Sequence, residues 1–531
     1  MGISHSSVFL ASAGVFLVAA LGIAWHKHCT SPPEWIKELE VLGRPRKEKL
    51  DGTAVVCGGR RVFGAVFNLI AGTVAARVLA DHFDRVILVD PELDDMERPR
   101  TRIMQYNAAH GFLTLFVDGV RRLCPDFDKE LSAAGGRIAS ADYNLHYSGI
   151  PIPSPYGDFP GGRLPGTLAM RRSEAQKTLY RLLIQHSTAA ENISVCPGTV
   201  RGVESSEDNT SILSVIVRKP DGTQLAINDI SLVVGTSQAG VKWLGNAGYT
   251  LPANLRCFYK PNIRYVTICF SVSPEIESKL PIPQFAFNRL AEYVYIQHFT
   301  YGSFLAALTK TDNNTMQLML TSSEDNLPRT MSEVIPFIST IRGHEPLAPW
   351  FVETVEKLCE HCPDASFDIL KIPDQSYVKY HSVPEGSLPR NFVAVGDSNL
   401  QLNPVHGQGF AKIMLNAITL NSLLHSLDSA GPTLPPDFSA RYFKTNSART
   451  EGLWNATRMH DYGASTCEPM GGETRDTGRL VRWFRLKILS AATQYEDVAS
   501  VLWHVHNLIA ADKALFAPRI LGKVLWTPSR F

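Results

Sequence analysis

Between Asn391 and Leu424 the sequence places an acid, a proline and several glycines at close spacing. Asp397 follows a short apolar run, and NPVHGQG follows at Asn403 to Gly409. A carboxylate at the carboxyl end of a buried strand can accept hydrogen bonds from sugar hydroxyls. Glycines ahead of a helix let a ligand approach backbone N–H groups that carry a partial positive charge. The stretch therefore predicts a binding site for a ligand that carries sugar hydroxyls.

The elements that hold this stretch follow from its apolar residues. The run Phe392 to Val395 contains valines and ends at Gly396-Asp397, as a buried strand with a tight exit does. After the loop, apolar residues recur at helical spacing at Phe410, Ile413, Met414, Ala417, Leu420 and Leu424. The sequence therefore predicts a strand, a polar loop and a helix, with glycines at the helix entrance.

A second acid follows another predicted strand near the start of the chain. Two apolar runs read as strands, Thr53 to Cys57 and Arg85 to Val89, and the small residues of Ala71 to His82 read as a helix between them. Gly58-Gly59 follows the first strand and Asp90 follows the second. This order is the plan of a dinucleotide-binding fold, in which the acid accepts from ribose hydroxyls.

The glycine loop of this unit is interrupted. Nine residues, Arg61 to Leu69, separate Gly58-Gly59-Arg60 from Ile70-Ala71-Gly72. Removing them restores an uninterrupted loop and a usual distance to Asp90. Two interpretations stay open: a true loop extension that bulges outward, or mis-spliced intron sequence.

The motif GD followed by NPVHGQG resembles the second flavin-binding fingerprint of the class A FAD-dependent monooxygenases, in their epoxidase-like branch. The resemblance extends over roughly Asp51 to Phe531. It implies an α/β fold: a Rossmann-like FAD-binding domain, an interleaved β-sheet substrate domain and a C-terminal helical segment. His406 departs from the family, which usually has an aromatic residue there. If the GD dipeptide is considered alone, the alternative to a flavin-binding motif is an ordinary strand-loop-helix with a capping aspartate.

The resemblance implies one FAD, NAD(P)H as co-substrate and no metal site. Asp397 would meet the ribityl or ribose hydroxyls, and Pro404 with the GQG backbone would lie against the isoalloxazine ring. Asp90 would bind the adenosine ribose, Gln105 would reach the flavin edge, and Arg172 would lie near the phosphates. The full set of expected FAD contacts is Gly58, Gly59, Gly72, Asp90, Arg102, Gln105, Arg172, Gly396, Asp397, Pro404, Gly407, Gln408 and Gly409.

One expected motif is damaged. The family carries D-x-T-G after the last strand of a β-meander, and here the strand Ile230 to Val234 is followed by GTSQAG. The aspartate is absent, although the downstream VKWLGNAGY matches the family. Farther along, WNATRMHD at Trp454 to Asp461 resembles a C-terminal family signature.

The first residues predict a membrane anchor. Val8 to Trp25 is almost continuously apolar and just long enough to cross a bilayer. Basic residues follow the run and none precedes it, so the body would lie in the cytosol. We therefore expect a single-pass protein of the endoplasmic reticulum. A cleaved signal peptide is the alternative, but it requires a basic region that is missing.

Length and composition agree with a globular enzyme of several domains. The chain has 531 residues, 44% hydrophobic and 19% charged, and a net charge of +1 that implies no nucleic-acid partner. Nine scattered cysteines favour reduced thiols. The expected divisions are an anchor at 1–28, a linker at 29–50, an FAD-binding domain at 51–250 and 386–430, a substrate domain at 251–385 and a helical region at 431–531.

These features predict an FAD-dependent monooxygenase, an epoxidase or hydroxylase that uses NAD(P)H and O₂. Its substrate would be a lipophilic small molecule of secondary metabolism such as a terpenoid or polyketide. No protein acid or base is required for simple epoxidation, so no catalytic residue is assigned. The alternatives are a flavin-dependent reductase of isoprenoid double bonds, a degenerate flavoprotein with impaired FAD binding, and a halogenase, which the absence of a W-x-W-x-I-P motif disfavours.

Overall fold

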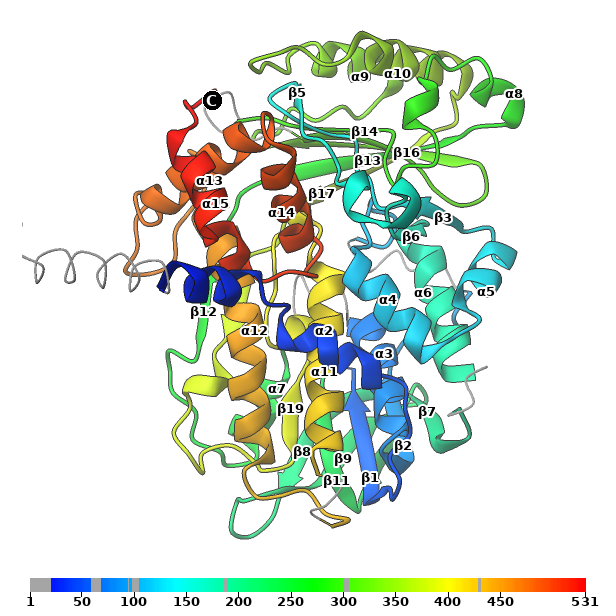
Figure 1. Ribbon diagram of the computed structural model, residues 1–531. Helices are drawn as coiled ribbons and strands as arrows, with labels where there is room; N and C mark the ends of the chain where they lie inside the picture. Colours follow the sequence, from blue (N-terminus) through cyan, green and yellow to red (C-terminus); the bar gives the residue numbers. More distant parts are fainter. Residues whose placement is uncertain are drawn as a thin grey trace, which may run out of the picture.

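The computed structural model describes residues 21–58, 68–93, 95–97, 105–185, 190–298, 305–427 and 431–531. Two main sheets lie one above the other in Figure 1, and a group of C-terminal helices packs beside both of them. The lower sheet holds the dinucleotide-type unit that the sequence predicts, and the upper sheet covers the loop that follows Asp397.

The lower sheet has five strands, and every neighbouring pair is parallel. In spatial order they are β19 (Phe392–Ala394), β11 (Ile230–Gly235), β1 (Leu50–Cys57), β2 (Phe83–Asp90) and β7 (Ile193–Pro197). The central strands are continuously apolar because both faces of the sheet are covered, which is typical of parallel sheets. The expected strands ending at Gly58, Asp90 and Gly396 are therefore confirmed.

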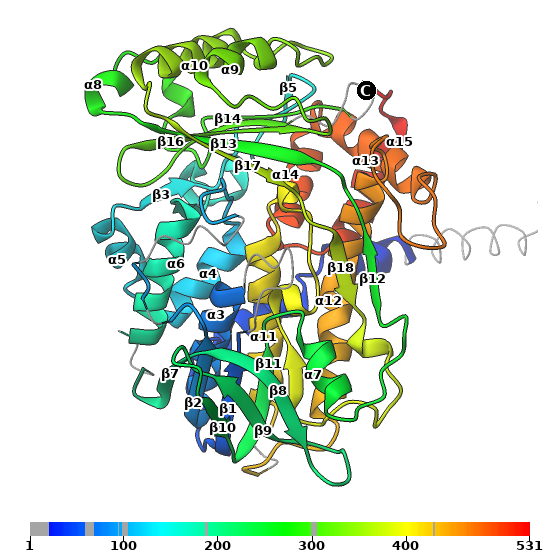
Figure 2. The same ribbon diagram turned by 180° about the vertical axis from the view of Figure 1, so that it is seen from behind.

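Helices and a small sheet cover the two faces of the parallel sheet. On one face lie α3 (Asn68–Ala80), α11 (Gly409–His425) and α4 (Thr114–Leu123), of which α3 packs directly on β2. On the other face lies the antiparallel meander β8 (Thr199–Ser205), β9 (Ile212–Arg218) and β10 (Gln224–Ile227), seen in front in Figure 2.

The upper sheet has seven strands. In spatial order they are β17 (Ser366–Lys371), β13 (Arg264–Ser271), β16 (Thr315–Ser322), β15 (Leu305–Lys310), β14 (Tyr293–Ile296), β4 (Leu145–Tyr147) and β5 (Ile150–Pro151). Alternate residues of β13, Val266, Ile268 and Phe270, pack under α9 (Met331–Ile338) and α10 (Pro349–His361). Tyr265, on the opposite face, packs towards Val405 of the glycine-rich loop. The alternation of side chains along β13 thus separates an outer core from an inner face.

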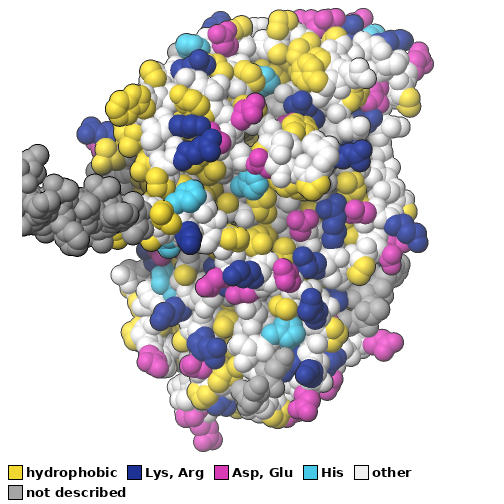
Figure 3. All heavy atoms as spheres, viewed as in Figure 1, with side chains coloured by type: hydrophobic (Ala, Val, Ile, Leu, Met, Phe, Trp, Pro, Cys, Tyr) yellow, Lys and Arg dark blue, Asp and Glu magenta, His cyan; other side chains and the backbone are white. Residues whose placement is uncertain are grey.

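Four C-terminal helices complete the molecule: α12 (Phe438–Asp461), α13 (Arg479–Ala492), α14 (Glu496–His506) and α15 (Pro518–Trp526). Helix α12 lies along α11, where Asn416 Nδ2 donates to Asn446 Oδ1 at 2.7 Å. Helix α14 reaches the upper half, where Trp503 Nε1 donates to the carbonyl of Ala141. The corner formed by α13 and α15 leaves Leu480, Trp483 and Trp526 exposed, and hydrophobic side chains gather there in Figure 3.

Some element boundaries differ from the predictions. Helix α3 begins at Asn68, so the last two residues of the presumed insertion, Asn68 and Leu69, belong to the helix. The strand expected from Ile230 to Val234 is β11, and the preceding residues form β10 in a different sheet. The chain turns between them at Asp229, whose φ of 58° lies in the left-handed region. A left-handed residue is a local turn that apolar periodicity does not reveal.

The predicted single-pass membrane protein is contradicted. None of the helices in the described part combines the length and apolarity that crossing a bilayer requires. The anchor at 1–28, the transmembrane element of the fold class and the assignment to the endoplasmic reticulum therefore lack support. Val8 to Ala20 lie outside the described residues. Leu21 to Thr30 form a helical segment whose Trp25 Nε1 donates to the carbonyl of Phe516 at 3.0 Å.

Candidate functional site

Asp397 lies where the carboxyl end of β19 meets the first turns of α11. The chain leaves β19 through Gly396, whose φ of 64° favours glycine. Asp397 is 2% exposed, and its Oδ1 lies 2.7 Å from the Nζ of Lys412, which also donates to the carbonyl of Leu400. Lys412 is fully buried, so the two charges neutralise each other inside the protein.

The loop from Asn403 to Gly409 is held by its own polar side chains. Asn403 Oδ1 accepts from the N–H of Val405 at 3.1 Å, which shapes a short 3₁₀ turn at Pro404–His406. Gly407 then adopts a left-handed conformation, with φ of 70°, and α11 begins at Gly409 after Gln408 as its N-cap. The predicted glycines therefore stand where the chain turns into the helix, and the first-turn N–H groups point out of its N-terminal end.

Three of the predicted FAD contacts meet at one small hollow. Gln105, Asp397 and Pro404 line it together with Pro373, Gln375, Gln401 and Leu402, and its volume is about 180 Å³. Gln105 is 2% exposed, and its Oε1 has no hydrogen-bond partner among the described residues. A buried acceptor of this kind is costly unless a ligand or water satisfies it.

Arg172 lies close to this group at the start of α6 (Arg172–Tyr180). It is 1% exposed, and burial lowers the pKa of its guanidinium to about 10, opposed by the charges of Tyr265 and Asp397 among others. Its neighbour Arg171 points elsewhere and forms an ion pair with Asp312 at 2.6 Å. The Arg171 pair ties α6 to the upper sheet and leaves Arg172 directed at the lower site.

The adenosine end of the predicted site is built on β1, β2 and α3. Asp90 is 5% exposed, and one of its oxygens accepts from the N–H of Glu92 at 2.9 Å. A Cβ on Gly58 would lie only 2.2 Å from the other carboxylate oxygen, so glycine is required there. A Cβ on Gly72 would meet the Leu88 side chain at 3.3 Å, which shows that α3 packs closely on the sheet. Gly59 and Arg102 lie outside the described residues.

The region of the missing aspartate is occupied by uncharged residues. Thr236 is fully buried and donates through both its N–H and its hydroxyl to the carbonyl of Cys57. Gln238 Nε2 donates to Ser376 Oγ at 2.8 Å and to Gln401 Oε1 at 3.0 Å, and Gln401 lines the small hollow. Backbone contacts and amides therefore bridge β11 to the site without a carboxylate.

Two neighbours of the site were not anticipated from the sequence. Lys412 lies among apolar residues of a predicted helix. The only feature of the sequence that could have identified it is a charged residue within an otherwise buried run. Asp461, at the end of α12, accepts from His406 Nε2 at 3.0 Å and from Asn403 Nδ2 at 2.9 Å. The second contact fixes the glycine-rich loop from 58 residues away in sequence, a separation that pattern reasoning does not bridge.

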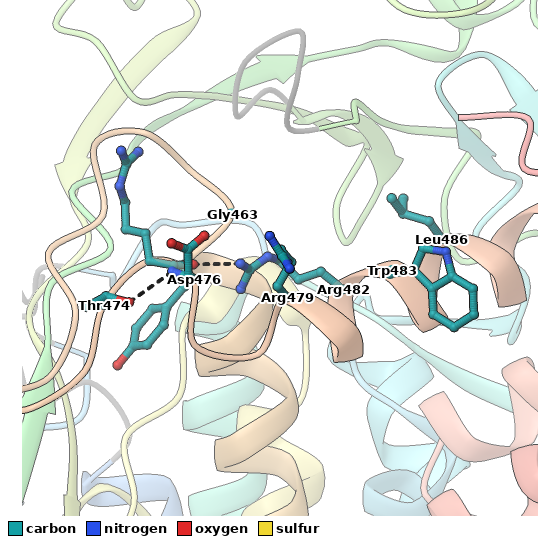
Figure 4. A pocket seen from close by; sticks show the side chains of 9 residues that line it. Gly463, Thr474, Asp476, Arg479, Arg482, Trp483 and Leu486 are labelled. Carbon is teal, nitrogen blue, oxygen red and sulfur yellow. Dashed lines mark hydrogen bonds between the residues drawn. The ribbon is translucent and has the colours of Figure 1, made fainter.

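A second hollow, of about 580 Å³, lies on the outer side of the C-terminal helices (Figure 4). Its lining comes from the C-terminal cap of α12, the loop that follows it and α13, and consists of Tyr462, Gly463, Thr474, Arg475, Asp476, Arg479, Arg482, Trp483 and Leu486. Arg482 is tied to backbone carbonyls of Met459, Thr477 and Arg475. None of the predicted FAD contacts lines this hollow.

The described residues fit a bound FAD. The orphaned Gln105 Oε1, the buried acids Asp90 and Asp397, and the close packing at Gly72 are what a flavin dinucleotide would require. The hollow at Gln105 is too narrow to admit even a water molecule, whereas a typical ligand pocket has about 300–1,000 Å³. The described residues therefore account for the polar anchors of the cofactor and not for its volume.

Solved structures share this architecture at low sequence identity. The flavin-dependent brominase Bmp2 matches with a TM-score of 0.55 and 11% identity, over 90% of this chain and 99% of its own. A probable FAD-dependent monooxygenase, PqsL from Pseudomonas aeruginosa, matches with a TM-score of 0.54 and 14% identity, over 82% and 100%. A flavoprotein/dehydrogenase from Cytophaga hutchinsonii matches with 0.54 and 10%, over 89% and 96%.

No protein-family model matches the sequence, and no curated protein is similar enough in sequence to count as a relative. At these identities the structural neighbours establish the fold, and their flavin-dependent chemistry agrees with the motifs. The fold class predicted from the sequence is confirmed except for its N-terminal helix. The chain therefore has the fold of the class A FAD-dependent monooxygenases, the family that its GD and NPVHGQG motifs resemble.

Proposed function

We propose that this protein is an FAD-dependent monooxygenase that uses NAD(P)H and O₂ to oxygenate a lipophilic small molecule. The observation that carries the proposal is the meeting of Gln105, Asp397 and Pro404 at one hollow under the upper sheet. Gln105 lies far from Asp397 and Pro404 in the sequence, and the family resemblance implies a flavin contact for all three. The fold shared with flavin-dependent enzymes supports the same assignment.

Four groups of the chain would hold FAD. Asp90 would accept from the adenosine ribose, and Asp397 from the ribityl hydroxyls. Arg172 would neutralise phosphate charge, since a guanidinium binds phosphate bidentately. The N-terminal end of α11 would face the flavin ring and favour negative charge there. When bound, FAD supplies the transfer of electrons from NAD(P)H to O₂ and of one oxygen atom to the substrate.

The substrate would lie between the glycine-rich loop and the upper sheet. Val405 packs against Val294, Leu305 and Ala307 on β14 and β15, with Met319 and Tyr143 beside them. These side chains make a dry surface over the loop, which limits the access of water to the reacting centre. A lipophilic substrate fits such a surface because apolar area is removed from water on binding.

A degenerate flavoprotein is the second candidate. The buried Lys412 ion pair already satisfies one oxygen of Asp397, and the glycine loop carries the Arg61 to Leu69 insertion. A purified chain that shows no flavin absorbance, even after addition of FAD, would favour this candidate over the enzyme. A halogenase is disfavoured because the sequence lacks W-x-W-x-I-P, although Bmp2 is a brominase. Oxygen uptake coupled to NADPH oxidation would separate a monooxygenase from a flavin reductase.

Asp397→Asn is expected to weaken FAD binding about 10- to 150-fold, the loss of one charge-assisted hydrogen bond of about 1.5–3 kcal/mol. Asparagine keeps an oxygen that can accept from Lys412 but leaves the lysine charge unpaired, so the affinity is measured on protein that circular dichroism shows to be folded. FAD titration followed by quenching of flavin fluorescence measures the dissociation constant.

The matched control for this substitution is Asp312→Asn. Asp312 is fully buried and ion-paired like Asp397, but it binds Arg171 at the upper sheet. An unchanged FAD affinity in Asp397→Asn would show that the proposed placement of the cofactor is wrong. An equal loss in both variants would attribute the effect to general destabilisation.

A further inference from the structure

A cluster of polar side chains surrounds the inner end of the C-terminal helices, beyond the proposed FAD contacts. Its members come from five elements: His406 from the glycine-rich loop, His460 and Asp461 from the end of α12, Arg485 from α13, His506 from the end of α14 and Tyr147 from β4. The rings of His406 and His460 lie 5.2 Å apart between centroids. We call these six residues the donor cluster.

The only carboxylate of the donor cluster is fully engaged. Asp461 Oδ1 accepts from His406 Nε2 at 3.0 Å. Its Oδ2 accepts from Tyr259 at 2.7 Å and from Asn403 at 2.9 Å. Asp461 therefore positions the loop and the His406 ring, and it does not serve as an ion-pair partner for the arginine.

Several donors of the cluster have no partner among the described residues. Tyr147 is 2% exposed, and its hydroxyl makes no hydrogen bond there. Arg485 is half-buried and forms no hydrogen bond or ion pair with any described residue, although its charge acts on His460, His506 and Tyr147. An unpaired guanidinium and an orphaned hydroxyl in the interior are both costly, and a ligand that accepts from both would remove that cost.

The local electrostatics distinguish the charged Arg485 from the two buried histidines His460 and His506. Burial and then the charge of Arg485 lower the pKa of His506 to about 4 and that of His460 well below its ordinary value. Burial also lowers the pKa of Arg485 itself, opposed by Tyr147 and Asp461. Burial is the largest cause of each shift and disfavours the charged form, so His460 and His506 are neutral at pH 7, and Arg485 is the group among these three that attracts an anion.

A metal ion is the competing occupant, because His406, His460 and Asp461 place ligand atoms within 4.8 Å of one another. Three observations disfavour it. Both oxygens of Asp461 already accept hydrogen bonds. The positive charge of the Arg485 guanidinium acts on His460, and the donor cluster contains no second carboxylate to balance a dication. A dication beside an unpaired arginine would meet like charge at short range.

The donor cluster continues directly into the apolar surface over the glycine-rich loop. His406 follows Val405, and Tyr147 lies two residues after Leu145; Val405 and Leu145 pack in the same apolar group, with Ile296 and Met319. The outer hollow of Figure 4 adjoins the cluster from the other side, since Arg482 lines that hollow and its charge also acts on His460. A ligand in this region would meet an apolar wall and a donor-rich end.

We propose that Arg485 and Tyr147 bind a carboxylate at one end of the lipophilic substrate, whose apolar body lies against Val405 and the upper sheet. The proposal refines the proposed function by naming the substrate as an amphiphilic acid. Arg485 is a specificity-determining residue, because a neutral analogue would leave its guanidinium unpaired. A site built to bind a polar group of its substrate rejects the analogue that lacks this group. Binding is an equilibrium property, so it is testable without turnover.

The test compares octanoate with 1-octanol, which share an apolar chain and differ in the charged end. Isothermal titration of the full-length chain, saturated with FAD, gives both dissociation constants. The wild type is expected to bind octanoate at least tenfold more tightly than 1-octanol. Arg485→Met is expected to lose that preference while its affinity for 1-octanol is unchanged. Arg479→Met is the control, since Arg479 lies on the same helix and lines the outer hollow.

Other results would overturn the assignment. These are equal affinities for octanoate and 1-octanol in the wild type, retention of the preference in Arg485→Met, or an equal loss in Arg479→Met. Tighter binding of octyl phosphate than of octanoate would replace the carboxylate by a phosphate. Stoichiometric Zn²⁺ binding that His460→Ala abolishes would favour the metal. If Arg485→Met does not fold, Tyr147→Phe must weaken octanoate binding at least threefold. An octanoate preference in a chain that fails to bind FAD would refute the proposed function alone.

Discussion

Lys412→Met is expected to lower the free energy of unfolding by about 3–5 kcal/mol, the cost of removing one member of a buried ion pair. Lys412 is fully buried, and its Nζ lies 2.7 Å from Asp397 Oδ1. Methionine fills a similar volume, so most of the loss would come from the charge that Asp397 retains in the interior. Urea denaturation followed by tryptophan fluorescence measures the change.

The double variant Lys412→Met, Asp397→Asn separates the stranded charge from other effects. With both charges removed, the loss relative to wild type is expected to be clearly smaller than in Lys412→Met alone. Lys242→Met is the control for an exposed lysine, where the change is expected to stay within about 0.5 kcal/mol. A Lys412→Met protein as stable as wild type would show that the ion pair does not hold Asp397 in place.

The ion pair also bears on FAD. If Lys412 fixes Asp397, the carboxylate is preorganised for the ribityl hydroxyls and loses little entropy when the cofactor binds. Lys412→Met should then weaken FAD binding in the fraction of protein that remains folded. If the ion pair instead keeps Asp397 from binding FAD, the protein is a degenerate flavoprotein with impaired FAD binding. The FAD affinities of wild type and of Lys412→Met therefore show whether Lys412 prepares Asp397 for FAD or withholds it.

Local patterns in the sequence predicted the parts of the fold that are local in the chain. The strand before Asp90, the strand before Asp397 and the helix after Gly409 each carry their own periodicity, and each forms within a few residues of the expected bounds. Parallel strands end at the same edge of a sheet, which is why the acids Asp90 and Asp397 lie at the same edge.

Contacts between distant segments were not predictable from one sequence. The donor cluster draws His406, His460, Arg485 and Tyr147 from separate elements, and no spacing rule connects them. Strands β4 and β5 join the upper sheet although they lie within the segment expected to bind FAD. A lysine in an apolar helical run reads as a solvated residue until its partner, Asp397, is placed beside it.

The glycine at position 396 is the second place where a single substitution should have a large effect. Gly396→Ala is expected to lower the free energy of unfolding by about 2–5 kcal/mol. The φ of 64° costs about 1–2 kcal/mol for a residue with a Cβ, and the added methyl would lie 2.8 Å from Ala71 Cβ on α3. Chemical denaturation of purified protein measures the loss.

Gly407→Ala provides the matched control, because it isolates backbone strain from crowding. Gly407 has a φ of 70°, but a Cβ there would meet no atom within 4 Å. Its expected cost is the conformational part alone, about 1–2 kcal/mol. The difference between the two variants therefore measures how closely the Asp397 loop packs on α3. Equal losses in the free energy of unfolding would mean that α3 shifts to make room for the methyl group at no measurable cost. The Asp397 loop would then pack less tightly on α3 than the 2.8 Å distance from Ala71 Cβ indicates.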